Sequence, residues 1–306
     1  MKIPIRSALL LVALSSAAAA IAGSFPRAQA GIDPGKVFIS ADMEGITGVV
    51  QPAQLGPTGF EYGRAREWMT AEVRAAIEGA RAAGATSFVV ADAHGNAQNL
   101  LIDQLPEDVQ VVRGFPRPLS MMQGIDGTFA AAIFIGYHAS EMMPEAVRGH
   151  TFSSAKLLGV HLNGVEVSEG MFNAAIAGHF GVPVVFISGD RKAVVQLQGA
   201  APGVEGAIVK EALGYHSAMT MTPARGQVMI RNGVRSAFAK RQTIRPYVMK
   251  TPVSFEVGFK LTLDAERASY IPNLSRANAH AVRGTLPDML QLVKLMQVLT
   301  SLEPPS

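Results

Sequence analysis

Residues 37–45 constrain the fold of this chain more than any other segment. They begin as an apolar run typical of a strand buried on both faces, and they then change abruptly to the acidic sequence DMEG. Side chains alternate along an extended segment, so Asp42 and Glu44 point to the same side and can converge on one cation. The other interpretation of Asp42 is an N-cap at the start of a helix. By themselves, the two acids fit both interpretations.

Three later apolar runs are likewise followed directly by polar residues at their carboxyl ends. They are residues 87–91, 130–136 and 182–187, which run into Asp92-Ala93-His94, Tyr137-His138 and Ser188-Gly189-Asp190. In open α/β sheets, ligands gather outside the carboxyl ends of parallel strands. The repetition therefore predicts an α/β fold in which a mostly parallel sheet, flanked by helices, carries a polar site along its carboxyl edge.

A hairpin and a helix follow the third run. Residues 156–162 and 165–167 flank Asn163-Gly164, a pair that satisfies the positive φ angles of a tight turn. Ser168 is a predicted N-cap, which places Glu169 in the first turn of the next helix. Favourable interaction with the helix dipole would account for an acid there without any metal. A metal-binding role for Glu169 therefore depends on what lies beside it.

The first thirty residues have the features of a secretory signal. Lys2 and Arg6 precede an alanine-rich apolar stretch at 8–23, and Ala28-Gln29-Ala30 has the form of a cleavage site. We therefore expect an exported, periplasmic protein with no stable membrane association after cleavage. A membrane span usually needs about 20 apolar residues, and this stretch is shorter. The alternative to a cleaved signal is an N-terminal anchor that stays attached.

Charge and cysteine content exclude several classes of function. The net charge is +3, but residues 1–30 hold three of the 27 Lys and Arg residues and no acid, so the rest has 24 basic and 24 acidic residues. This balance gives no indication of nucleic-acid binding. The chain has no cysteine, which excludes disulfides, thiolate nucleophiles and thiolate zinc ligands. Nitrogen and oxygen atoms must hold any metal.

The character of the chain changes near residue 215. Beyond it, residues 223–241, 263–270 and 286–299 are predicted helices, and no apolar run ends in a paired histidine or carboxylate. We therefore predict three parts. They are a signal at 1–30, an α/β metal-binding catalytic domain at 31–215, and a second, smaller α/β unit at 216–306 that supports the first or makes subunit contacts.

The polar residues at the strand ends form a candidate metal site. Carboxylate and imidazole groups without thiolates suit zinc, manganese or iron, and five of them exceed what one tetrahedral zinc needs. Two metals together activate water and polarise a substrate oxygen, which is the chemistry of amide, ester or phosphoester hydrolysis. A single histidine of this kind is more often a hydrogen-bonded core residue. The candidates are Asp42, Glu44, His94, His138 and Glu169, with His150 close in sequence.

These residues lie in motifs that resemble the DppA-type D-aminopeptidases, a family of binuclear zinc peptidases. The resemblance covers nearly all of the chain from about Lys36, and Tyr62-x-Arg64-x-Arg66-x-x-Met69-Thr70-x-Glu72 resembles the first helix of the family. The other motifs, in order, are Ser40-x-Asp42-x-Glu44-Gly45, Asp92-x-His94, Gly136-Tyr137-His138-Ala139, Gly149-His150 and Glu169-x-x-x-Asn173-Ala174.

The resemblance implies a function. The five candidates would bind two zinc ions per subunit, one carboxylate bridging them, and His150 would be the catalytic histidine that polarises the carbonyl or passes a proton to the leaving amine. The substrates would be short peptides with an N-terminal D-residue such as D-alanine. The family also implies a homo-oligomer, a decamer of two five-membered rings. The signal segment is a departure, because the best-known members are cytoplasmic.

Two other functions are compatible with parts of this sequence. The sequence from Asp42 to Thr47 superficially resembles the first motif of haloacid-dehalogenase-type phosphatases, but that function leaves His94, His138 and Glu169 unexplained. An exported metal- or peptide-binding protein without catalysis is the second alternative. His150 argues against it, because a simple binding protein has no evident use for that residue.

Overall fold

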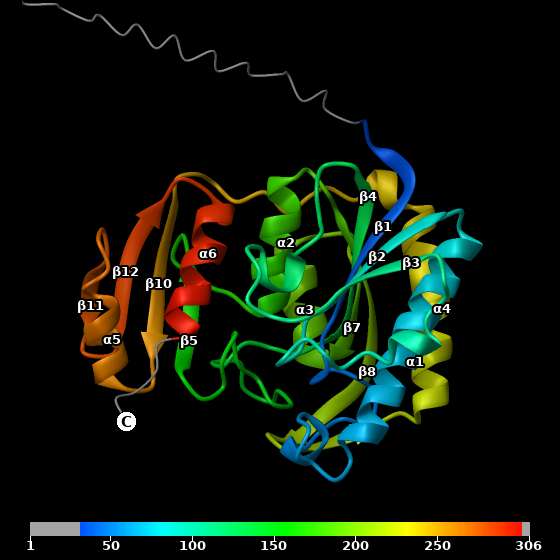
Figure 1. Ribbon diagram of the computed structural model, residues 1–306, viewed down its shortest axis with the longest axis horizontal. Coiled ribbons are helices and arrows are strands. Elements are labelled where there is room, and N and C mark those ends of the chain that lie inside the picture. The colour runs from blue at the N-terminus through cyan, green and yellow to red at the C-terminus, as the bar shows by residue number, and fades with distance from the viewer. Residues whose placement is uncertain (1–30, 302–306) are drawn as a thin grey trace, which may run out of the picture. The chain divides into compact units, whose positions relative to one another are not determined.

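A computed structural model describes residues 31–301, and the larger of its two sheets has seven strands (Figure 1). Its order is β3-β2-β1-β4-β7-β8-β9, and every neighbouring pair is parallel except β8 and β9. The predicted signal at 1–30 lies outside the described residues. The strands are β1 (Asp33–Ala41), β2 (Ser87–Asp92), β3 (Val109–Val112), β4 (Phe129–Tyr137), β7 (Val184–Asp190), β8 (Glu205–Gly214) and β9 (Ser217–Thr220).

Strand β1 is apolar because helices cover both of its faces. Val37 and Ile39 belong to the core on the side of α1 and α4, and Phe38 belongs to the core on the opposite side. Contacts with the sheet place α1 and α4 on one face and α2 and α3 on the other (Figure 1). These helices are α1 (Tyr62–Ala82), α2 (Glu169–His179), α3 (Arg191–Ala200) and α4 (Pro223–Ala239).

The smaller sheet is antiparallel, with the order β11-β12-β10-β5-β6. Helices α5 (Thr262–Ala268) and α6 (Met289–Thr300) pack on it, and α6 also contacts α2. The predicted fold class, a mostly parallel sheet flanked by helices with a second smaller unit, is confirmed. The strands are β5 (Leu157–Leu162), β6 (Val165–Glu166), β10 (Val253–Phe259), β11 (Ser275–Asn278) and β12 (Ala281–Leu286).

The predicted hairpin is present as β5 and β6. Asn163 and Gly164 have φ angles of 47° and 84°, as the tight turn requires. Strand β5 pairs with β10 of the smaller sheet, while α4 packs on α1 of the larger one. Both sheets therefore draw on elements from both sides of residue 215. The division into domains at that position stays a prediction.

Some elements were not predicted, namely α3, β8, β9 and β11. The sequence pattern did not predict β8, because Lys210 and Glu211 interrupt its apolar residues. Short 3₁₀ turns complete the described structure at Pro52–Gln54, Ile102–Gln104, Ser120–Met122 (η3) and Arg241–Thr243. No helix within residues 31–301 combines the length and apolarity needed to cross a membrane.

The backbones at the carboxyl ends of β1, β4 and β7 contact one another directly. The amide of Gly45 donates to the carbonyl of Gly136 over 2.7 Å. A Cβ atom on Gly45 or on Gly189 would lie 2.0 Å from the carbonyl oxygen of Tyr137. Any larger residue would force these strand ends apart. The two glycines therefore let the residues that follow β1 and β4 approach each other closely.

Candidate metal centre

The structure brings all five predicted ligands and His150 together. Asp42, His94 and His138 follow the neighbouring strands β1, β2 and β4, and Glu44 lies in the loop after β1. Glu169 opens α2, where the Ser168 hydroxyl accepts a hydrogen bond from the Met171 amide as the predicted N-cap. All six site residues are buried, with exposed fractions from 1% to 8%.

Each imidazole in the cluster faces at least one carboxylate. His94 Nδ1 lies 2.8 Å from Glu44 Oε2 and 3.2 Å from Asp42 Oδ1. His138 Nε2 lies 3.4 Å from Asp42 Oδ2 and 3.5 Å from Glu169 Oε2. Two groups of three residues could each hold a metal ion, because the possible ligand atoms within each group lie within 4.8 Å of one another. One group is Asp42, Glu44 and His138, and the other is His138, His150 and Glu169.

The three histidines share one arrangement. In each, one ring nitrogen contacts a backbone carbonyl, which only accepts, so that nitrogen carries the proton. The partners are Leu55 for His94 Nε2 at 2.8 Å, Ala139 for His138 Nδ1 at 2.9 Å, and Arg148 for His150 Nδ1 at 2.9 Å. The other nitrogen then turns toward the carboxylates. Metal-ligating histidines are typically oriented in this way.

Buried polar atoms without a hydrogen bond indicate that the cluster fits a metal. Asp42 Oδ2 and His138 Nε2 lie 3.4 Å apart, but neither makes a hydrogen bond of acceptable geometry. Burying polar atoms in this way is costly unless a partner is present. A divalent cation would satisfy them, and the set of carboxylate and imidazole groups suits zinc, manganese or iron.

The pKa values reflect the crowding of like charges without a metal. Burial, and then repulsion by Glu44, raise the pKa of Asp42 to about 7. Burial opposes protonation of His138, but the charges of Glu169 and Asp42 prevail and raise its pKa to about 10. Burial also opposes protonation of His94, but the charges of Glu44 and Asp42 prevail and raise its pKa well above the usual value. These two protonated imidazoles offset the charge of the acids, a role that bound cations would take over.

His150 differs from the other two histidines. Burial and the charge of His138 lower the pKa of His150, so it is neutral at neutral pH. Its ring stacks on that of His138 with centroids 4.0 Å apart. Its Nε2 lies 3.7 Å from Glu169 Oε1, which also accepts a hydrogen bond from the Phe152 amide. A neutral imidazole with a free Nε2 can accept a proton.

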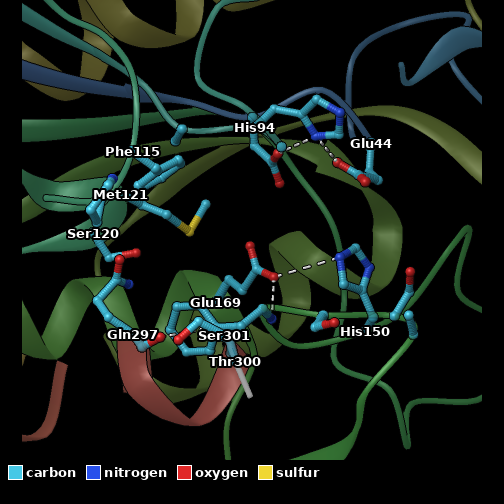
Figure 2. Close-up of a pocket in the computed structure, with 18 of the residues that line it drawn as sticks. Glu44, His94, Phe115, Ser120, Met121, His150, Glu169, Gln297, Thr300 and Ser301 are labelled. Atoms are coloured by element: carbon cyan, nitrogen blue, oxygen red, sulfur yellow. Dashed lines mark hydrogen bonds and ion pairs between the residues drawn. The ribbon is translucent and has the colours of Figure 1, made fainter. Parts of the chain in front are cut away.

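A cavity of about 840 Å³ opens in front of the cluster. Figure 2 shows Glu44 and His94 on one side and the last turn of α6 on the other, with Glu169 and His150 between them. Cavities of this size hold small ligands or short peptides. Other lining residues include the apolar Phe115, Met121 and Phe152, Gln297 and Thr300 of α6, and Ser301, which directly follows that helix.

The peptidase M55 family, described as D-aminopeptidase, matches residues 36–298. The chain belongs to this family. It is also 28% identical over 271 residues to a D-aminopeptidase of Bacillus subtilis strain 168, covering 87% of this chain and 97% of that protein. The solved structure of the Zn-dependent D-aminopeptidase DppA from Bacillus subtilis, a self-compartmentalizing protease, superposes with a TM-score of 0.84 at 28% identity and the same coverage.

Family membership settles the choice among the predicted functions. The phosphatase alternative accounted only for the acids after β1, whereas the match to the M55 family runs through every strand that carries a site residue. The chain is accordingly a peptide hydrolase of the D-aminopeptidase family rather than a phosphatase or a simple binding protein.

Asp92 orients the loop after β2 in this M55 protein. Its carboxylate accepts from the amides of Asn99 and Leu100 over 2.6 and 2.8 Å, and Asn99 Nδ2 donates to the His94 carbonyl over 2.6 Å. Asp92 therefore holds the backbone that carries His94 and makes no direct hydrogen bond to the imidazole.

Two buried residues from other elements hold the loop that contains Glu44. Lys210 of β8 is 2% exposed, and its ammonium donates to the carbonyls of Glu44, Ile46 and Val49. Sequence reasoning missed Lys210, although a lysine in the middle of an apolar strand is the signal that could have found it. Glu72 of α1 accepts from the Thr47 amide over 2.9 Å.

The buried carboxyl of Glu72 generates a prediction about pH. Burial raises its pKa from about 4.5 in the unfolded chain to about 7 in the folded protein. The folded state thus binds this proton more tightly, and the resulting stabilisation is complete below about pH 4.5 and is lost as the pH rises through about 7. The Glu72→Gln variant cannot ionise at this position. We therefore expect its free energy of unfolding, relative to that of wild type, to increase by about 3 kcal/mol between about pH 4 and pH 8, because the pKa of Glu72 rises from 4.5 to about 7 on folding.

Urea unfolding of both proteins in chelator, at both pH values, measures this difference. Glu78→Gln is the matched control, because Glu78 lies on the same helix with its side chain exposed and paired with Arg231. The prediction would be contradicted if the difference in free energy of unfolding between Glu72→Gln and wild type were the same at both pH values.

Proposed function

We propose that this chain is a zinc-dependent aminopeptidase that releases N-terminal D-amino acids of the D-alanine type from short peptides. The observation that carries the proposal is the buried cluster of carboxylates and uniformly oriented imidazoles at the base of a cavity of about 840 Å³. Family membership and the zinc dependence named for the Bacillus subtilis relative support it.

The residues that would hold two zinc ions are Asp42, Glu44, His94, His138 and Glu169. Bound zinc would supply Lewis-acid polarisation of the scissile carbonyl and a more acidic water.

His150 is the residue we assign to proton transfer. Its Nδ1–H is fixed on the Arg148 carbonyl, its Nε2 lies 3.7 Å from Glu169 Oε1, and the residue lines the cavity. The imidazole would accept a proton at Nε2 from the attacking water and return it to the leaving amine. The lowered pKa supports the proton-accepting form as the resting state.

The test of function is hydrolysis of D-alanyl and L-alanyl p-nitroanilides by the purified protein lacking residues 1–30. It should be run as isolated, after chelation, and after zinc is returned. We expect cleavage of the D substrate, loss of activity with chelation, and recovery with zinc. Cleavage of neither substrate while two metals remain bound would contradict the proposal.

His150→Ala should lower kcat by roughly 10²–10⁴-fold, because a positioned proton-transfer group contributes about that much. Zinc content, measured by atomic absorption, should stay at two ions per chain. Glu44→Ala is the matched comparison and should lose zinc and activity together. Loss of zinc from the His150 variant would make His150 a ligand instead, which the second group of possible ligands permits.

We also propose a compartment and an assembly. The signal-like features of residues 1–30 support export to the periplasm, where the enzyme would trim D-alanine-containing fragments from cell-wall turnover. The relative's description as self-compartmentalizing supports a homo-oligomer, for which we propose a decamer of two five-membered rings. Periplasmic fractionation followed by native mass spectrometry should find ten chains per particle. Finding the protein in the cytoplasmic fraction would contradict the proposed compartment, and finding a monomer would contradict the proposed assembly.

A further inference from the structure

Three fully buried polar residues lie beside the proposed ligands and take no part in the proposed reaction. Ser40 precedes Asp42 by two residues, Tyr137 directly precedes His138, and Asn173 follows Glu169 by one helical turn. None of the three lines the cavity. They come from β1, β4 and α2, elements that each carry or adjoin a proposed ligand.

Hydrogen bonds connect the three residues in one direction. The Ser40 hydroxyl donates its single proton to the carbonyl of Met121, 3.0 Å away. The bond of 2.7 Å between Ser40 Oγ and the Tyr137 hydroxyl must therefore be donated by Tyr137. Asn173 Nδ2 donates to the Tyr137 oxygen over 3.0 Å and contacts Met121 Sδ at 3.2 Å. The chain runs from Asn173 through Tyr137 and Ser40 to Met121.

Tyr137 is the centre of this chain, and its ring is fixed in place. It stacks on Phe134 with centroids 4.7 Å apart and planes inclined by 16°. Its carbonyl lies at the close contact with Gly45 and Gly189. Its hydroxyl therefore stays in one place, and β1 and α2 are positioned against it. Each bond is buried, so breaking one leaves a polar group without a partner.

We propose that this hydrogen-bonded chain is a positioning device that sets where Asp42, His138 and Glu169 lie relative to one another, and thereby the affinity of the site for zinc. The inference rests on the proposed function for the identity of the metal. A purely structural chain would contribute to stability alone, whereas a positioning chain must also alter zinc affinity.

The experiment compares Tyr137→Phe with wild type. The substitution keeps the stacked ring but removes the hydroxyl that joins Ser40 and Asn173. We expect the zinc Kd, measured by competition with a chromophoric chelator, to rise roughly 10- to 100-fold, the usual effect of losing a group that supports metal ligands. At saturating zinc, kcat should fall and KM should stay within about twofold, because the residues lining the cavity are unchanged.

Val257→Ala is the matched control for stability. Val257 is fully buried in β10 of the smaller sheet, remote from the cluster in the strand order. Its truncation should lower the Tm, since a buried cavity is left, and leave zinc affinity at the wild-type value. Tyr137→Phe with wild-type zinc affinity would overturn the proposal, whatever its Tm.

Ser40→Ala and the Ser40→Ala/Tyr137→Phe double variant test whether the chain acts as one unit. We expect the double variant to bind zinc about as weakly as the weaker single variant, because either change breaks the same chain. The proposal would be overturned if the fold-losses of zinc affinity in the two single variants multiplied in the double variant. Ser40→Ala also decides the matter if Tyr137→Phe does not fold, since unchanged zinc affinity would contradict positioning.

The two proposals can fail separately. A wild-type protein that binds zinc but does not cleave D-alanyl substrates would refute the proposed function, while the zinc affinities of the variants would still decide the positioning role. A wild-type protein that binds no zinc would refute both.

Discussion

The parallel pairing of β1 with β2 and β4 is the constraint on which the site depends. Parallel strands present their carboxyl ends at one edge, so Asp42, His94 and His138 emerge side by side. Glycines at positions 45 and 189 then allow backbone contact between the strand ends. The result is a cluster of acids and imidazoles buried at a depth that isolated charges would not tolerate.

Burial of this cluster is compensated within the protein and by any metal it binds. His94 and His138 offset the charge of the carboxylates, and all three imidazoles direct one N–H to a backbone carbonyl. The same rule extends to the loop after β1, where the buried ammonium of Lys210 is surrounded by three carbonyl oxygens. Polar groups thus fix the surroundings of the site, and apolar packing covers both faces of the sheet that carries it.

The second part of the chain contributes directly to the cavity. Helix α6 packs against α2, which begins with Glu169, and its last turn forms the wall opposite Glu44 and His94 (Figure 2). The smaller sheet holds α6 in this position through β12. The cavity therefore combines a base of ionisable residues from the larger sheet with a neutral wall from the C-terminal helix.

The sequence by itself determined the parallel α/β sheet, the polar groups at its edge, the Asn163-Gly164 turn and the Ser168 cap, because each depends on residues close together in the chain. The assignment of His150 came from resemblance to a family, since its position after β4 has no periodic pattern. Only the tertiary structure decided the pairing of Lys210 with the loop at Glu44, 166 residues away, and of Ser40 with Tyr137, 97 residues away. Contacts of this kind depend on how elements pack in three dimensions, which local patterns do not encode.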